Sequence, residues 1–152
     1  MASPQEILQT EIKDALRSGD KDRLRTNRLL LSEVKNKSLE LGREVGQTEL
    51  LSLVQKAIKQ RREAAQMYRD GSRPELVDKE LAEIAILEGY LPPAADEDEI
   101  RKGIQALVDE KNLEGPGAIG VIMKEMMARL AGSADGATIN RLAREILSPK
   151  SG

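Results

Sequence analysis

Residues 74–100 read PELVDKELAEIAILEGYLPPAADEDEI and contain both a helix and the point where the chain divides. Pro74 suits the first turn of a helix, and apolar residues then recur every three or four positions, which is helical rather than strand spacing. The consecutive prolines Pro92 and Pro93 cannot continue a helix, and they form a stiff spacer. Asp96 is a good N-cap for a further helix beyond them. This stretch therefore predicts two helical parts with a boundary at the prolines.

Helical spacing also continues on the N-terminal side of this stretch. Ser3 followed by Pro and Gln-Glu reads as a capped start, and Gly19 ends that first helix. A second helix covers about 21–41, and a third begins near Thr48. With the helix that follows Pro74, these give a four-helix N-terminal domain over residues 1–91.

The C-terminal side predicts three short amphipathic helices. Turns at 115–117 and 132–136 separate them, because each turn is rich in glycine. Short amphipathic helices joined by tight turns are typical of a small bundle. We therefore predict an all-α protein, in which the four-helix part is followed by a small three-helix bundle over residues 96–148.

Each of the second, third and fourth helices has an apolar stripe that we expect to face the core. Their members are, in turn, Leu24, Leu31, Val34 and Leu41; Leu50, Val54, Ala57, Ile58, Ala65 and Tyr68; and Val77, Leu81, Ile84, Ala85 and Leu91.

The composition excludes several kinds of catalysis. The chain has no Cys, His, Trp or Phe, so it has no Ser-His-Asp triad, thiolate nucleophile or zinc site of Cys and His. The acids of 96–99 are explained by the dipole of the helix that they begin. Glycines at 115–120 lack the Lys-Ser/Thr ending of a phosphate loop. We expect no catalytic residue, no metal and no cofactor.

Hydropathy gives an expectation for location. No apolar run approaches the ~20 residues of a membrane span. Residues 1–10 lack a charged region followed by an apolar stretch, which argues against a signal peptide. We therefore predict a cytoplasmic protein without a membrane partner.

The positive charges gather in one part of a nearly balanced chain. Residues 21–63 contain 11 basic and 6 acidic side chains, whereas 70–88 contain 6 acidic and 2 basic ones. A basic flank of this kind can face a nucleic-acid backbone, although a solvated face with i,i+4 ion pairs is the alternative explanation. The candidate nucleic-acid-binding residues are Lys21, Arg25, Arg28, Lys35, Lys56, Lys59 and Arg62.

Two charges and three methionines interrupt or extend the apolar stripes. Arg61 and Glu88 fall in the middle of stripes, where a charge needs a partner. We predict that they form a structural ion pair or reach one shared polar cluster. Met123, Met126 and Met127 fit core packing, and alternatively an adaptable groove for a partner helix.

Several segments resemble YqeY-like proteins. They are 28–37 (RLLLSEVKNK), 57–63 (AIKQRRE), 87–92 (LEGYLP) and the run from Gly120 to Gly136, which occur in the same order as in that family. The C-terminal part is similar to the tail domain of the B subunit of the tRNA-dependent amidotransferase (GatB), which contacts tRNA.

This resemblance implies a GatB/YqeY-type helical domain and a tRNA partner rather than a catalytic site. A family label of carbon–nitrogen ligase with glutamine as amido-N-donor would describe association with that enzyme. Relatives carry basic residues in the last turn, where this chain has Ala131, Ser133 and Ala137. We therefore expect the N-terminal basic flank to be the surface that faces RNA.

Two hypotheses of function follow. The first is an accessory tRNA-binding protein, which serves a tRNA-dependent amidotransferase or an aminoacyl-tRNA synthetase and recognises RNA through its phosphates. The alternative is a helical protein-interaction adaptor that does not bind RNA and uses the methionines.

Overall fold

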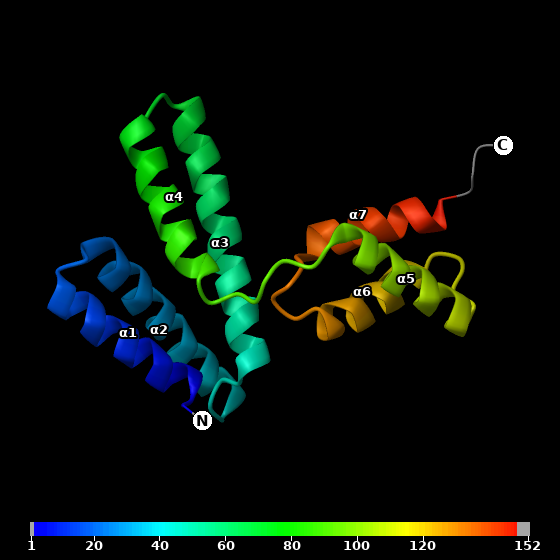
Figure 1. Ribbon diagram of the computed structural model, residues 1–152, viewed down its shortest axis with the longest axis horizontal. Helices are drawn as coiled ribbons and strands as arrows, with labels where there is room; N and C mark the ends of the chain where they lie inside the picture. Colours follow the sequence, from blue (N-terminus) through cyan, green and yellow to red (C-terminus); the bar gives the residue numbers. More distant parts are fainter. Residues whose placement is uncertain (1, 149–152) are drawn as a thin grey trace. The chain divides into compact units, whose positions relative to one another are not determined.

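The computed structural model describes residues 2–148, and within that range the chain forms seven helices and no strand (Figure 1). This confirms the all-helical prediction. The chain divides into an N-terminal unit that ends at Leu91 and a C-terminal unit that begins at Pro92. The helices of the first unit are α1 (Pro4–Ser18), α2 (Lys21–Leu41), α3 (Gln47–Asp70) and α4 (Pro74–Glu88); those of the second are α5 (Glu97–Lys111), α6 (Ala118–Arg129) and α7 (Gly136–Leu147).

Short polar caps and glycines set the helix ends. The hydroxyl of Ser3 accepts a hydrogen bond from the Glu6 amide, and the Asp20 carboxylate accepts one from the Arg23 amide. Gly19 lies between them with φ of 74°, a left-handed conformation that glycine adopts without steric cost. The sequence between α1 and α2 therefore forces a tight reversal, and the two helices pack side by side (Figure 1).

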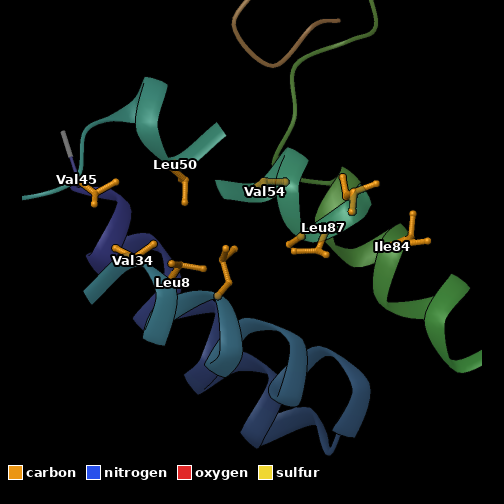
Figure 2. Packing of buried hydrophobic residues seen from close by; sticks show 10 residues of the cluster. Leu8, Val34, Val45, Leu50, Val54, Ile84 and Leu87 are labelled. Atoms are coloured by element: carbon orange, nitrogen blue, oxygen red, sulfur yellow. The ribbon is translucent and has the colours of Figure 1, made fainter. Parts of the chain in front are cut away.

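The core of the N-terminal unit draws on all four helices. Figure 2 shows Leu50 of α3 directed toward Val34 of α2 and Leu8 of α1, and Val54 of α3 belongs to the same buried cluster. Leu87 of α4 is fully buried in the same cluster. α3 is the longest helix, at 24 residues. It packs against α2 and pairs closely with α4, so it joins the α1–α2 pair to the α3–α4 hairpin.

The buried face of α2 differs from the predicted stripe. Val34 is buried as expected, but Leu41 is 37% exposed, and Leu24 and Leu31 are only partly covered. The other buried residues of α2 are Thr26, Asn27 and Leu30. The buried face of α2 is therefore rotated about the helix axis relative to the predicted stripe. The prediction used apolar residues only, so it left out the buried polar residues Thr26 and Asn27.

The buried face of α4 also differs from its stripe. Val77 and Ile84 are buried as predicted, whereas Leu81 is 43% exposed and Ala85 is exposed. Glu83 is buried instead. The carboxylate lies inside because two other helices supply cations to it, as described below.

The core of the C-terminal unit is apolar and is shared by its three helices. Ile104, Ile122 and Leu142 are fully buried there. The amide of Ala95 donates to the carbonyl oxygen of Ser133 at 2.8 Å. The start of this unit is thereby tied to the turn that precedes α7.

Candidate nucleic-acid interface

Three of the predicted cationic residues form a row on α2. Lys21, Arg28 and Lys35 are all exposed, and no ion pair to them is seen within residues 2–148. They are seven residues apart, which places them on one line of the helix with successive positions separated by about 10.5 Å. We call them the α2 row. This row therefore offers positive charge that the described part of the chain does not pair.

The α3 candidates are less uniform. Lys56 and Lys59 are exposed, about one turn apart, and lack an ion pair in the described part of the chain. The guanidinium of Arg62 lies 3.4 Å from the carboxylate of Glu88, and the two side chains are 59% and 49% exposed. Exposed pairs of this kind contribute little. Arg62 therefore remains available to an external anion.

Arg25 differs from the other candidates because its charge is already committed. Its Nε donates to Glu83 at 2.9 Å, and its Nη2 donates to Asp22 at 2.8 Å. The hydrogen bond to Glu83 raises the pKa of the Arg25 guanidinium above its ordinary value. Arg25 thus serves the contact between α2 and α4, and it is the weakest of the seven candidates for binding RNA.

The predicted pair of Arg61 and Glu88 is corrected by the structure. Arg61 Nε donates to Glu83 at 3.0 Å, and the two side chains are 14% and 7% exposed. Arg61 also donates to the carbonyl oxygen of Ala57 at 3.1 Å. Arg61 is therefore held inside as expected of a charge in an apolar stripe, but its partner is Glu83, and Glu88 is on the surface with Arg62.

The physical reason is that Glu83 of α4 lies where arginines of both α2 and α3 reach its carboxylate. Its two carboxylate oxygens accept from Arg25 of α2 and Arg61 of α3. The helical wheel of an α3–α4 hairpin omits α2, so it gave no reason for an acid at this position to be buried. A signal was present, because Glu83 lies four residues before Leu87 and seven after Leu76, on the same face as both.

Sequence reasoning also missed a second polar contact inside the N-terminal unit. The Tyr90 hydroxyl donates to the side-chain oxygen of Asn27, and burial raises the pKa of the Tyr90 phenol. The Oγ1 of Thr26 and the Nδ2 of Asn27 are buried without a hydrogen-bond partner. Tyr90 is therefore occupied in the fold and does not offer a free ring and hydroxyl to a base.

The methionines of α6 take part in the core of the C-terminal unit. Met126 is buried, and Met123 and Met127 pack against the same cluster while partly covered. A Cβ atom on Gly103 would lie 3.0 Å from Met126 Cε. Close packing of α5 on α6 thus occupies Met126, one of the three methionines that the adaptor hypothesis would use.

Four of the seven cations between residues 92 and 148 make ion pairs, and Lys102, Lys124 and Arg144 do not. Arg101 and Arg141 make ion pairs with Glu97 and Glu145, which link α5 to α7.

Among residues 2–148, no group of three or more acidic, His or Cys side chains is arranged to hold a metal ion. No helix in the same range is long and apolar enough to cross a membrane.

Comparison with known proteins places the chain in a family. The fold and the surface define a helical protein with an exposed basic row and a second, apolar-cored helical unit. A family model described as "Yqey-like protein" matches residues 5–147. The chain belongs to the YqeY-like family.

Three relatives share the description "Altered inheritance of mitochondria protein 41, mitochondrial". The protein of Pyrenophora tritici-repentis is 30% identical over 94% of this chain and 80% of the relative. That of Lachancea thermotolerans is 33% identical over 72% of this chain and 60% of the relative. That of Saccharomyces cerevisiae strain YJM789 is 28% identical over 82% and 68%, respectively.

These names correct the predicted location. All three relatives are described as mitochondrial proteins, which overturns the prediction of a cytoplasmic protein. That prediction was based on the absence of a signal-peptide pattern in residues 1–10, and hydropathy alone does not distinguish one internal compartment from another.

Proposed function

We propose that this protein is an accessory tRNA-binding protein that serves a tRNA-dependent amidotransferase or an aminoacyl-tRNA synthetase. The observation that supports this most is the α2 row of Lys21, Arg28 and Lys35, whose exposed charges have no ion-pair partner among residues 2–148. Unneutralised cations in a line are what a phosphate backbone requires. Lys56, Lys59 and Arg62 extend the cationic surface onto α3.

The mode of recognition follows from what the chain lacks. It has two aromatic residues, and both Tyr68 and Tyr90 are partly covered. Stacking on unpaired bases therefore contributes little, and binding rests on phosphate contacts and on the shape of the RNA. Affinity that rests on phosphates falls steeply with salt, because binding releases counterions.

Filter binding of total tRNA tests the proposal directly. The affinity of the full chain is measured between about 50 mM and about 200 mM salt. The triple variant Lys21→Glu, Arg28→Glu and Lys35→Glu is compared with the intact chain. We expect weaker binding, and a slope of log K on log salt that is shallower by about 2 to 3, which corresponds to three lost phosphate contacts.

A matched control carries the same change of net charge elsewhere. Lys13, Lys79 and Lys102 are exposed lysines on α1, α4 and α5. Their joint replacement by Glu should leave the salt slope within error of the intact chain. Absence of tRNA binding at about 50 mM salt would overturn the proposal. Equal losses in the two triple variants would show that the α2 row has no specific role.

A further inference from the structure

A groove runs along the α3–α4 hairpin on a face that the other helices of the N-terminal unit leave uncovered. Its larger hollow has a volume of about 560 Å³, and its smaller one, near the hairpin turn, about 250 Å³. Arg69 borders both, so the two hollows are neighbours along the hairpin. Ala65, Leu81 and Ile84 contribute apolar atoms to the larger hollow.

The apolar face of α4 is wider than the part that the other helices of the N-terminal unit cover. Val77, Ile84 and Leu87 are buried, whereas Leu81 and Ala85 line or border the open groove. Leu81 and Ala85 are four residues apart and therefore adjacent on the helix surface. An apolar ridge with no internal partner is typical of a surface that meets another protein.

The two edges of the groove carry opposite charges. The α3 edge has Arg62 and Arg69, and the α4 edge has Asp78 and Glu88; Arg73, at the hairpin turn, also borders the smaller hollow. Arg62 and Glu88 bridge the edges at one end. Arg69 and Asp78 border the same hollow near the turn, yet no ion pair to either is seen in the described part of the chain.

This charge pattern selects the kind of partner. A nucleic acid presents negative charge throughout, so it would be repelled by the acidic α4 edge. A partner that fits must carry an acidic edge opposite α3 and a basic edge opposite α4. A second copy of the hairpin, rotated by half a turn so that its groove faces the first, presents its acidic α4 edge to α3 and its basic α3 edge to α4.

We propose that two copies of this chain associate through this groove, with α3 of each copy against α4 of the other. A two-fold axis parallel to the hairpin produces this arrangement and keeps residues at the same height. Arg69 then faces Asp78 of the second copy, and Leu81 and Ala85 of both copies are covered. An axis perpendicular to the hairpin would instead place the arginines of one α3 against those of the other.

The length of α4 limits the strength of the association. Its 15 residues span about 22 Å, so two hairpins can bury only an area at the low end for specific interfaces. The dimer should therefore be weak and concentration-dependent. The proposal goes beyond tRNA binding and does not rest on it, because the α2 row is not part of the groove; of the proposed RNA contacts, Arg62 borders the groove.

Sedimentation equilibrium of the full chain up to about 1 mM, the range of weak complexes, tests the proposal. We expect the intact chain to approach the mass of two chains. Arg69→Glu and Asp78→Arg should each remain monomeric. In a dimer of either variant, residues 69 and 78 of facing copies would carry the same charge, and the two-fold symmetry repeats this repulsion at both contacts. An equimolar mixture of the two variants should dimerise again, because each new charge then meets its opposite on the other chain.

Matched controls separate this result from a general effect of charge. Arg17→Glu and Asp14→Arg make the same changes at exposed sites of α1 and should leave the dimer unchanged. Arg69→Lys keeps the positive charge and should also dimerise. Circular dichroism confirms that each variant is folded.

Three outcomes overturn the proposal. They are a monomeric intact chain at about 1 mM, the upper end of measurable weak association, an Arg69→Glu variant that dimerises like the intact chain, and a mixture of variants that stays monomeric. If the intact chain is monomeric and Arg69→Glu weakens tRNA binding, the groove is an RNA surface rather than a contact between copies.

Discussion

The two units of this protein fill their interiors in different ways. The buried polar and charged residues of the described chain are Thr26, Asn27 and Glu83, and all three lie in the N-terminal unit. The C-terminal unit buries apolar side chains such as Ile104 and Leu142 in its core. Its ion pairs, by contrast, link α5 and α7 through partly exposed side chains.

This difference shows what each interior contributes. Apolar packing accepts many arrangements of about the right volume. The Glu83 carboxylate, in contrast, is satisfied only when α2 and α3 both bring an arginine to it. The polar contacts of the N-terminal unit therefore fix how the α1–α2 pair meets the α3–α4 hairpin, whether or not they add net stability.

Of the changes that test this difference between the two units, breaking the ion pair of Arg61 and Glu83 should alter stability most. Arg61→Met removes one of the two cations of Glu83 and leaves a buried carboxylate only partly compensated. We expect the free energy of unfolding of the N-terminal unit to fall by about 3 kcal/mol. Lys59→Met, on the exposed face of α3, should change it by less than about 0.5 kcal/mol.

Amide hydrogen exchange measures this effect separately in the two units. Exchange at Val54 reports on the N-terminal unit, and exchange at Ile104 reports on the C-terminal unit. Arg61→Met should accelerate exchange at Val54 and leave that at Ile104 unchanged. Equal effects of Arg61→Met and Lys59→Met would mean that Glu83 does not need its second arginine.

A buried hydroxyl without a partner gives a smaller effect of opposite sign. Thr26→Val keeps the branched shape of the side chain and removes the Oγ1 that lacks a hydrogen bond. We expect the N-terminal unit to become more stable by about 1 kcal/mol in urea denaturation.

Thr10 provides the control for this substitution. It is exposed and donates to the carbonyl oxygen of Glu6 within α1. Thr10→Val should leave stability within about 0.5 kcal/mol. A loss of stability in Thr26→Val would show that the hydroxyl has a partner, such as an internal water molecule.

The smallest effect is expected from the exposed ion pairs of the C-terminal unit. Arg101→Gln removes contacts to Asp98 at 2.9 Å and to Glu97 and Glu145 at 3.7 Å. Because Arg101 is 41% exposed, we expect a loss of less than about 1 kcal/mol. The loss should disappear in about 1 M salt, which screens exposed charges. A larger, salt-independent loss would contradict the distinction drawn between the two units.

The helix ends could be predicted from sequence because they depend on local chemistry. Ser3, Asp20 and Asp96 cap helices through their side chains, and Gly19 needs only its own backbone freedom. The stripe on α3 was also predicted well, because its buried residues include Leu50, Val54, Ala57, Ile58 and Ala65.

The buried polar residues could not be predicted in the same way. The buried Asn27 is bonded to Tyr90, and the buried Glu83 to Arg25, across 63 and 58 residues of sequence. A helical wheel describes one helix at a time, so it cannot show that a second and a third helix will supply the missing partners. The residues of the candidate interface likewise differ in whether sequence alone could assign them. The exposed α2 row follows from its seven-residue spacing, whereas the structural role of Arg25 required the whole fold.

The shared core of the N-terminal unit also determines the order in which it can fold. α1 pairs with α2, and α3 with α4, so most contacts are local and each pair can form rapidly. The cluster that joins the pairs nevertheless contains both Leu8 and Leu87. At synthesis rates of about 5–20 residues per second, the interval from the end of α2 to Leu87 lasts roughly 2 to 9 seconds. During that time the apolar face of the α1–α2 pair lacks the part of its cover that α4 supplies, and transiently exposed apolar surface of this kind is prone to aggregation.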